Sequence, residues 1–356
     1  MRVLHLAAGN RWTGAAAPAF AEVEALRGAG IEAHYAYVGG YKLEQKIGHL
    51  DFAHAIIEKA QNPAAFLRSV SAVRRLIVER KIDVVHAHLT YDHWLARFAG
   101  RGTTLARTFH ARRVLRTDPL SRRLNAGTEL LFVVNDSFRD TLPSAAFTPP
   151  PVDHRQFHPD GPDVRAQYGI SPETKLVTVI GKVSKGRGFE DALHTFAQLR
   201  RTTPETRLMI IGHGEHRPAL ESLASELGIT EHVLWAGYHE DDLAEHYRAS
   251  DLLLFTARGS DEGHRAVLEA MACGVPPMSF PIEGVSALTG ALTSQLIAPD
   301  STPAALAATV AARLGTNRAE LRSQVAQRSQ DFGYDRAAGR LREHYGRVSE
   351  SPVSGN

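Results

Sequence analysis

The sequence predicts an α/β protein built from two doubly wound parallel sheets, and three observations lead to that prediction. Short apolar runs of strand length alternate with longer amphipathic stretches over most of the 356 residues. This is the βαβ rhythm of a parallel sheet with covering helices. The rhythm stops at a proline-rich segment, residues 143–163, and then restarts. At about 150 residues per domain, the length also suggests two domains.

The individual elements follow from periodicity and from helix-ending residues. In the first half, strands are expected at residues 3–7, 31–38, 84–87, 105–109 and 131–134, and helices at 17–28 and 62–80. In the second half, strands are expected at 175–180, 207–211, 233–235 and 251–255, and a helix at 265–273. Six prolines in residues 143–163 exclude a helix or a central strand there, so we interpret this segment as the inter-domain linker. The expected domains are residues 1–160 and 161–331, followed by a C-terminal helix and frayed tail at 332–356.

Composition excludes several classes of protein. A net charge of +2 with neutral histidines and a hydrophobic content of 43% rule out a long disordered chain and weigh against a nucleic-acid binder. Cys273 is the only cysteine, which excludes a disulfide scaffold. No run reaches the roughly 18 apolar residues of a spanning helix, and the N-terminal run is too short for a signal peptide. We therefore expect a cytoplasmic protein, with peripheral contact at the inner membrane face left open.

The most informative segment is residues 259–276, which holds Asp261, Glu262 and Glu269 around the start of an expected helix. Eight helical residues rise about 12 Å, so Asp261 and Glu269 on one helix could touch an elongated ligand at two points. The free amides of the first turn would then face an anion between them. The alternative is a capping aspartate beside an unrelated helix glutamate.

A second motif, residues 181–188, follows a strand, opens a helix and contains Lys182 and Arg187. Cations at this place could hold a nucleotide diphosphate and stabilise the negative charge that grows as it leaves. A solvated basic turn is the alternative. Gly212 and Gly214 follow the next strand, where glycine permits a close backbone approach or forms a simple turn.

Histidines follow two strands of the first half. His86 and His88 point the same way on a strand, and His93 lies nearby in the sequence. A metal site is conceivable, but no carboxylate or cysteine completes the set, so we favour structural histidines. His110 closes the next strand, and its position alone is that of a capping or core histidine.

Together, these segments resemble the retaining glycosyltransferases of the GT-B fold in glycosyltransferase family four, which includes bacterial mannosyl- and glucosyltransferases. The family pattern is Glu, seven residues, Glu, then Ala-Met-Ala-x-Gly-x-Pro, and residues 268–276 read Leu-Glu-Ala-Met-Ala-Cys-Gly-Val-Pro. This chain departs from the pattern at Asp261, in the first glutamate position, and at Glu262, in the usual glycine position. Further matches are Asp-Val-Val-His-Ala-His at 83–88 and Phe-Gly-Tyr-Asp at 332–335. In the family, the latter starts a helix that returns to the first domain.

The resemblance implies two doubly wound Rossmann-like domains facing across a cleft. It implies transfer of a hexose, with retention, from a nucleotide-diphosphate sugar to an acceptor hydroxyl without a metal ion, in cell-surface polysaccharide or glycolipid synthesis. The catalytic set that it implies is Lys182, Arg187, His110, Asp261 and Glu269, with Glu269 on the ribose and His110 on the donor sugar. The donor-binding set that it implies is Gly14, Gly181, Gly212, Gly214, Gly237, Tyr238, Glu262, Gly263, His264 and Arg265.

The expected partners are a UDP- or GDP-sugar and a sugar, lipid-linked or small-molecule acceptor, with no nucleic acid. The basic residues from Arg107 to Arg123 form either a solvated face or a contact for anionic lipid head groups. The chain contains no Asp-x-Asp triplet, so a metal-held diphosphate has no support. Two other functions stay open: epimerisation or phosphorolysis on the same architecture, and a nucleotide-sugar binder that has lost turnover.

Overall fold

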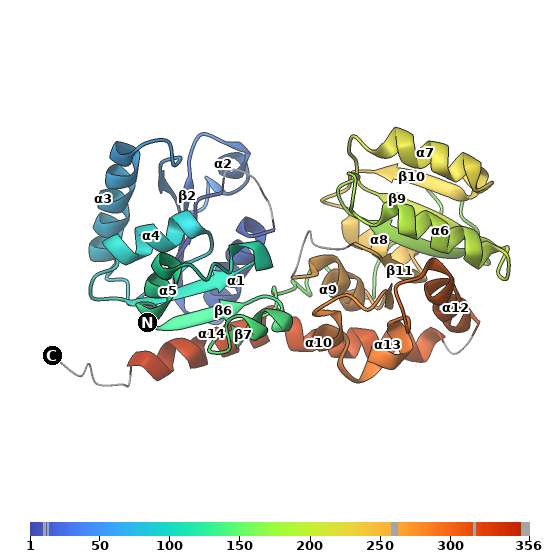
Figure 1. The fold of residues 1–356 in the computed structure, drawn as a ribbon. Coiled ribbons are helices and arrows are strands. Elements are labelled where there is room, and N and C mark those ends of the chain that lie inside the picture. The colour runs from blue at the N-terminus through green and yellow to red at the C-terminus, as the bar shows by residue number, and fades with distance from the viewer. Residues whose placement is uncertain (10–11, 13, 258–262, 316–317, 350–356) are drawn as a thin grey trace. The chain divides into compact units, whose positions relative to one another are not determined.

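The computed structural model describes residues 1–9, 12, 14–257, 263–315 and 318–349 (Figure 1). Contacts divide the chain into two units. The first contains Met1–Pro151 and the C-terminal segment that begins at Phe332, and the second contains Val152–Ser260 and His264–Asp331. The sequence places the boundary between residues 160 and 161, whereas the contacts place it between Pro151 and Val152.

The first unit has a seven-stranded sheet in the order β3-β2-β1-β4-β5-β6-β7, and every pairing in it is parallel. Its strands are β1 (Arg2–Ala7), β2 (Glu32–Val38), β3 (Ala53–Ile57), β4 (Val84–Ala87), β5 (Thr104–Phe109), β6 (Leu130–Val133) and β7 (Ala146–Phe147). Its helices are α1 (Ala16–Gly28), α2 (Lys42–Ile47), α3 (Pro63–Arg80), α4 (Thr90–Ala99), α5 (Pro119–Ala126) and α14 (Tyr334–Ser349).

The second unit has a five-stranded parallel sheet in the order β10-β9-β8-β11-β12. Its strands are β8 (Lys175–Ile180), β9 (Thr206–Ile211), β10 (Val233–Gly237), β11 (Leu252–Phe255) and β12 (Pro277–Ser279). Its helices are α6 (Phe189–Arg200), α7 (Arg217–Glu226), α8 (Leu243–Ala249), α9 (Arg265–Ala272), α10 (Val285–Thr289), α11 (Thr293–Leu296), α12 (Pro303–Leu314) and α13 (Arg318–Ser329).

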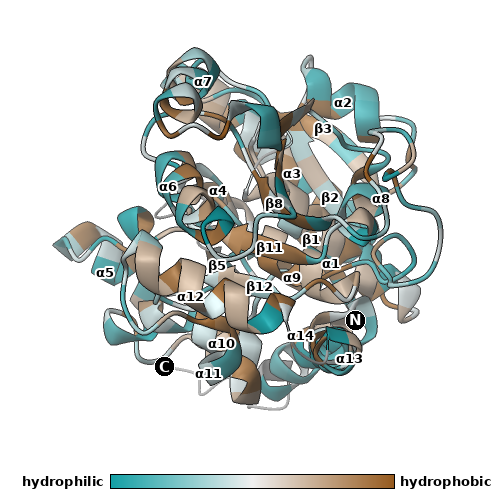
Figure 2. Ribbon diagram, turned by 90° about the vertical axis from the view of Figure 1, so that its right-hand side faces the viewer, coloured by the Kyte–Doolittle hydropathy of each residue, from teal (hydrophilic) through white to brown (hydrophobic). Residues whose placement is uncertain are grey.

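The strands are apolar on both faces because helices cover both faces of each sheet. In the first unit, Val3 of β1 packs in one core cluster with residues of α1 and α14, while Leu4 packs in another with residues of α3 and α4. Because successive side chains of a strand point to opposite faces of the sheet, Val3 and Leu4 lie in different core clusters. Figure 2 shows the hydrophobic strands β8 and β11 in brown and the largely hydrophilic helix α2 in teal.

The three strands that the sequence does not predict lie where its signals are weak. β3 is half-buried and pairs on one side only. β12 has three residues and begins at Pro277. β7 lies inside the proline-rich segment and at the edge of its sheet. Prolines are tolerated next to an edge strand, because such a strand pairs on one side only.

The C-terminal helix α14 packs against α1 within the first unit. Ala337, Leu341 and Tyr345 belong to the same core cluster as the buried face of α1. The Tyr334 hydroxyl donates a hydrogen bond to Glu24 Oε2 over 3.1 Å. In the described part of the chain, none of the helices has the length and apolar character needed to cross a membrane.

The basic stretch that begins at Arg107 is not one surface. Arg107 lies on β5 and is only 1% exposed. Burial lowers the pKa of its guanidinium to about 10, and the nearby Asp92 carboxylate opposes that shift. The prediction that Arg107 faces lipid head groups is therefore wrong, since β5 turns this side chain into the unit. Four arginines around α5 are exposed and stay available for the predicted contact: Arg113, Arg116, Arg122 and Arg123.

Candidate donor site and histidine cluster

The second unit gathers its predicted site residues at the carboxyl edge of its sheet. The strand order places β8 between β9 and β11, and the connections reverse direction between β8 and β11. In open α/β sheets, ligands bind at such a switch point, just beyond the carboxyl ends of the strands. The loop 181–188 follows β8, and the segment leading to α9 follows β11. These two connections flank the switch point.

Glycines let the connecting loops touch backbone to backbone. A Cβ on Gly212 would lie 1.8 Å from the Gly181 carbonyl oxygen, and one on Gly214 would lie 2.0 Å from the Val183 carbonyl oxygen. A Cβ on Gly188 would lie 2.2 Å from the Thr256 carbonyl oxygen, beyond β11. Real Cβ contacts are never this short, so these three positions require glycine.

Hydrogen bonds join the same loops. The Gly181 amide donates to the Ile211 carbonyl over 3.0 Å, and the Val183 amide donates to the His213 carbonyl over 3.0 Å. The Thr256 hydroxyl donates to the Gly188 carbonyl over 2.7 Å. The close approach that glycine permits here is therefore to neighbouring backbone. These contacts hold the loops that follow β8, β9 and β11 against one another at the carboxyl edge of the sheet. We call this group of loops the platform.

The two predicted diphosphate cations lie on this platform. The Lys182 side chain is 64% exposed, and its Nζ lies 3.9 Å from Glu215 Oε2, in an exposed pair that adds little stability. Arg187 is half-buried and makes no hydrogen bond or ion pair within the part of the chain that the structure describes. Arg187, and Lys182 once it leaves its weak exposed pair, can therefore meet an anion at the switch point.

Glu269 is held firmly on α9. Its side chain is 12% exposed, and its Oε1 lies 3.3 Å from Arg265 Nε, one helical turn earlier. The hydroxyl of Tyr247, from α8, donates to Glu269 Oε2 over 3.1 Å. Burial, and then the charge of Glu269, raises the pKa of Tyr247 well above its ordinary value, so this hydroxyl stays a donor. A carboxylate has about four acceptor sites, so Glu269 can still accept from a ligand.

The start of α9 corrects one geometric expectation. The helix begins at Arg265, preceded by His264 in the left-handed region with φ 52°, so it does not extend back to Asp261. The argument that Asp261 and Glu269 lie on one helix is therefore wrong. His264 is buried, and its Nε2–H donates to the Glu283 carbonyl over 2.7 Å. The N-cap residue, His264, makes no side-chain capping hydrogen bond to the first turn of α9.

Asp261 and Glu262 lie outside the described residues, and Gly263 is buried immediately before His264.

Gly237 and Tyr238 lie at the end of β10. Gly237 has φ 87°, and its carbonyl accepts a hydrogen bond from the Gly212 amide over 2.6 Å. Tyr238 is 60% exposed, and its ring packs edge-to-face on His213 with centroids 5.2 Å apart. An exposed ring fixed by a neighbour provides a flat apolar face at the rim of the site.

In the first unit, His110 follows β5 and is bonded at one nitrogen only. Its Nε2 lies 2.9 Å from His88 Nδ1, whereas its buried Nδ1 has no partner among the described residues. Burial, assisted by Arg107, lowers the pKa of His110 to about 3, so the ring is neutral at physiological pH. Gly14 stands just before α1, and an added Cβ would meet nothing within 4 Å.

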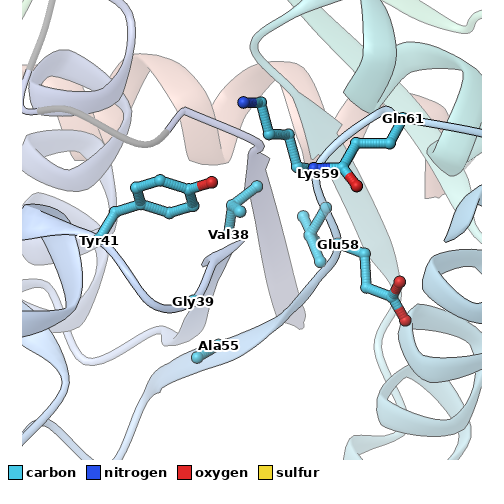
Figure 3. Close-up of a pocket in the computed structure, with 8 residues that line it drawn as sticks. Val38, Gly39, Tyr41, Ala55, Glu58, Lys59 and Gln61 are labelled. Atoms are coloured by element: carbon cyan, nitrogen blue, oxygen red, sulfur yellow. The ribbon is translucent and has the colours of Figure 1, made fainter.

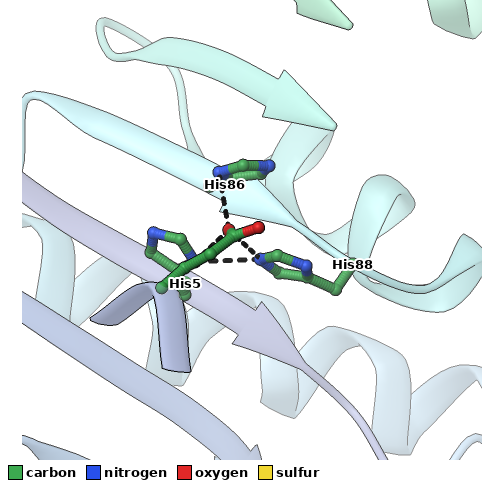
Figure 4. Close-up of side chains that lie close together, drawn as sticks. His5, His86 and His88 are labelled. Carbon is green, nitrogen blue, oxygen red and sulfur yellow. Dashed lines mark hydrogen bonds and ion pairs between the residues drawn. The ribbon is translucent and has the colours of Figure 1, made fainter. Parts of the chain in front are cut away.

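His88 and His86 are not isolated, and the expectation that no carboxylate accompanies them is wrong. His5 of β1 is paired in register with His86 of β4, and Glu22 of α1 faces both. His5, His86 and His88 lie together in Figure 4. His93 lies apart from them, with its Nε2 2.7 Å from Thr128 Oγ1. Sequence spacing could not identify Glu22, because a β–α connection separates it from His5.

A separate pocket lies at the carboxyl ends of β2 and β3 (Figure 3). It has a volume of about 340 Å³ and is lined by Tyr41, Glu58, Lys59 and Gln61 together with apolar residues of both strands. Arg68 donates two hydrogen bonds to the Glu58 carboxylate, over 2.6 and 2.7 Å. The pocket is thus polar and lies in the first unit.

Two family models match the chain. The one described as "Glycosyl transferases group 1" matches residues 160–332, and "Glycosyltransferase Family 4" matches residues 12–151. The GDP-mannose-dependent alpha-(1-6)-phosphatidylinositol monomannoside mannosyltransferase of Mycolicibacterium smegmatis is 32% identical, over 58% of this chain and 60% of its own. The 2-deoxystreptamine glucosyltransferase of Streptomyces kanamyceticus is 27% identical, over 72% of this chain and 63% of its own. The chain therefore spans about 60% of the length of these curated relatives.

Solved structures share the architecture. Anabaena HepE in complex with UDP superposes with a TM-score of 0.82 at 16% identity, covering 98% of this chain and 100% of that one. A glycosyltransferase from Rickettsia africae superposes with a TM-score of 0.82 at 14% identity, covering 98% and 99%. At these identities the likeness shows the fold.

Proposed function

The chain belongs to the glycosyltransferases of the family-four type with the GT-B fold, and we propose that it transfers a hexose from a nucleotide-diphosphate sugar to an acceptor hydroxyl with retention of configuration. The observation that carries the proposal is the pair Lys182 and Arg187 on the glycine-packed platform, with Arg187 half-buried and unpaired within the described residues. The donor of one relative is GDP-mannose, and one structural neighbour holds UDP, which supports a nucleotide sugar as the donor class.

The roles follow from the chemistry of each group. Lys182 and Arg187 neutralise the diphosphate, and this stabilisation grows as the leaving group gains charge. Glu269, held by Tyr247 and Arg265, accepts hydrogen bonds from the ribose hydroxyls. The first turn of α9, whose amides His264 does not cap, lies where it can face the anionic donor. Neutral His110 offers Nδ1 to a substrate hydroxyl.

The bond changes balance without a protein nucleophile. The bond between the anomeric carbon and the phosphate oxygen breaks, and the nucleoside diphosphate leaves with the electron pair. The acceptor oxygen bonds to the same face of an oxocarbenium-like carbon. The acceptor proton passes to the departing phosphate oxygen. We propose that Lys182 and Arg187 make a metal ion unnecessary for this step, and that the acceptor is bound by the first unit, where the pocket beside Lys59 is one place for it.

Nucleotide binding tests the donor site. Calorimetric titration with UDP, GDP, ADP and TDP, with no divalent ion added, should give binding for one nucleotide. Glu269→Ala should weaken that binding at least tenfold, because losing hydrogen bonds to a carboxylate costs about 1.5–3 kcal/mol. The control is Glu226→Ala, since Glu226 is exposed at the C-terminal end of α7. Equal affinities in wild type and Glu269→Ala would refute the assigned role.

A further inference from the structure

The buried histidine cluster of the first unit has the composition and the spacing of a metal site. Its members are His5 from β1, Glu22 from α1, and His86 and His88 from β4 and the residue after it. All four are buried, at 0 to 3% exposure. One ligand atom from each lies within 4.8 Å of the others. Three imidazoles and one carboxylate form a donor set that suits Zn²⁺.

The distances around Glu22 are too long for hydrogen bonds and match the edges of a coordination shell. Glu22 Oε2 lies 3.6 Å from His5 Nδ1, 3.7 Å from His88 Nε2 and 3.9 Å from His86 Nδ1. A tetrahedral zinc ion with bonds of about 2.0–2.1 Å has ligand–ligand edges of about 3.3–3.4 Å. His5 Nδ1 and His88 Nε2 are hydrogen-bonded over 2.9 Å, and this contact would have to lengthen to admit an ion. Small shifts of these side chains would equalise the edges around one ion.

Unpaired polar atoms mark the same place. Within the described residues, Glu22 Oε2 and His5 Nε2 are buried and have no hydrogen bond. A buried acceptor without a partner is destabilising, and a cation on Oε2 would remove that penalty.

The outer nitrogens of two histidines are already supported. His86 Nε2 lies 2.7 Å from Thr108 Oγ1, and His88 Nδ1 lies 2.9 Å from His110 Nε2. Metal-binding histidines almost always donate their other N–H in this way. His86 Nδ1 also lies 2.7 Å from the Tyr345 hydroxyl, and this contact would give way to the ion.

A second group of possible ligands in the described residues, His239, Asp242 and His246, is better explained by hydrogen bonds. His239 Nδ1 lies 2.9 Å from Asp242 Oδ1, and its Nε2 lies 2.9 Å from the Ala236 carbonyl oxygen. His246 Nδ1–H donates to the Asp242 carbonyl over 3.0 Å. Both carboxylate oxygens of Asp242 accept from His239 Nδ1, whereas Glu22 Oε2 has no hydrogen bond among the described residues, so this group is a suitable control.

We propose that His5, Glu22, His86 and His88 bind one Zn²⁺ ion as a closed, four-ligand structural site in the first unit. The ion would join β1, β4 and α1. Its bond to His88 Nε2 would place the proton of that ring on Nδ1, which donates to His110 Nε2. His110 would then keep its proton on Nδ1, the nitrogen assigned to the substrate. The ion itself takes no part in the transfer chemistry and would affect it only through the tautomer of His110, a role that rests on the proposed function.

Metal content tests the proposal. Untagged full-length protein, supplied with zinc and dialysed against a weak chelator, should hold one zinc per chain by inductively coupled plasma mass spectrometry. Glu22→Gln should reduce zinc affinity at least tenfold, because it replaces a charged ligand by a neutral amide of the same shape. Asp242→Asn should keep the full stoichiometry, and so should Tyr345→Phe, which removes the competing hydroxyl.

Two further readouts keep the test independent of activity and folding. Cobalt substitution should give the intense visible bands of a tetrahedral site in wild type and lose them in Glu22→Gln. The urea midpoint of metal-free Glu22→Gln should match that of metal-free wild type, which shows that the variant folds. Zinc retained equally in Glu22→Gln, zinc lost in Asp242→Asn, or no bound metal in wild type would each overturn the proposal.

Discussion

Replacing Arg187 by alanine should lower kcat by a factor of about 10² to 10³, since removing one preorganised charge-stabilising group typically costs about 3–4 kcal/mol in the transition state. The loss should fall mainly on kcat, because the interaction strengthens as the diphosphate gains charge. Arg187 is half-buried, so its charge acts in a less polar environment than that of exposed Lys182. Lys182→Ala should therefore have the smaller effect. Steady-state kinetics with saturating acceptor measure both.

The control lies in the same loop. Lys185 is exposed and lies between the two cations in the sequence, so Lys185→Ala changes the loop charge by the same amount. It should leave kcat within about threefold of wild type, an effect below 1 kcal/mol. Equal losses for Lys185→Ala and Arg187→Ala would show that only the net charge of the loop matters. An Arg187→Ala enzyme with normal kcat would remove Arg187 from the mechanism.

Gly212→Ala should destabilise the second unit by roughly 3 kcal/mol or more, which places it among the large single-residue effects. The added Cβ would lie 1.8 Å from the Gly181 carbonyl oxygen, and the residue would keep a φ of 140° that alanine rarely adopts. The clash is with a backbone oxygen and the φ angle belongs to the backbone, so rotating a side chain relieves neither. Urea unfolding followed by circular dichroism measures the loss.

A glycine in the same unit serves as control for this substitution. Gly315 has φ −89°, and an added Cβ would lie 3.7 Å from its nearest contact, the Ala311 carbonyl oxygen. Gly315→Ala should change stability by less than about 1 kcal/mol, in the stabilising direction. If Gly212→Ala unfolds at the wild-type midpoint and only weakens donor binding, Gly212 contacts the donor rather than the neighbouring loop.

The sequence predicts the central strands of both sheets because each is an apolar run bounded by turn residues. β8 has the predicted bounds, and α3 begins one residue after the predicted start, with Asn62 as its cap. The sequence does not predict β3, which is half-exposed, or β12, which has three residues. Each forms because a neighbouring strand pairs with it. The GT-B fold is what the family resemblance implies, and it is confirmed by the structural comparison.

Site residues are predictable where one loop carries them and unpredictable where the fold brings them together. Lys182 and Arg187 could be read from a single strand–loop–helix segment. Tyr247 could not be associated with Glu269, because the two belong to different helices on opposite sides of β11 in the sequence. Glu22 was missed for the same reason, since its distance to His86 is set by the packing of α1 on the sheet.

The most direct test is the transfer reaction itself, followed by NMR of the product's anomeric proton. Wild-type enzyme with the nucleotide sugar identified by calorimetry and a panel of sugar, inositol and glycolipid acceptors should form a product with the anomeric configuration of the donor. Turnover should not require added Mg²⁺ or Mn²⁺. An inverted product would contradict the retaining mechanism. Nucleotide binding without transfer to any acceptor, or epimerised donor in the absence of acceptor, would contradict the proposed activity.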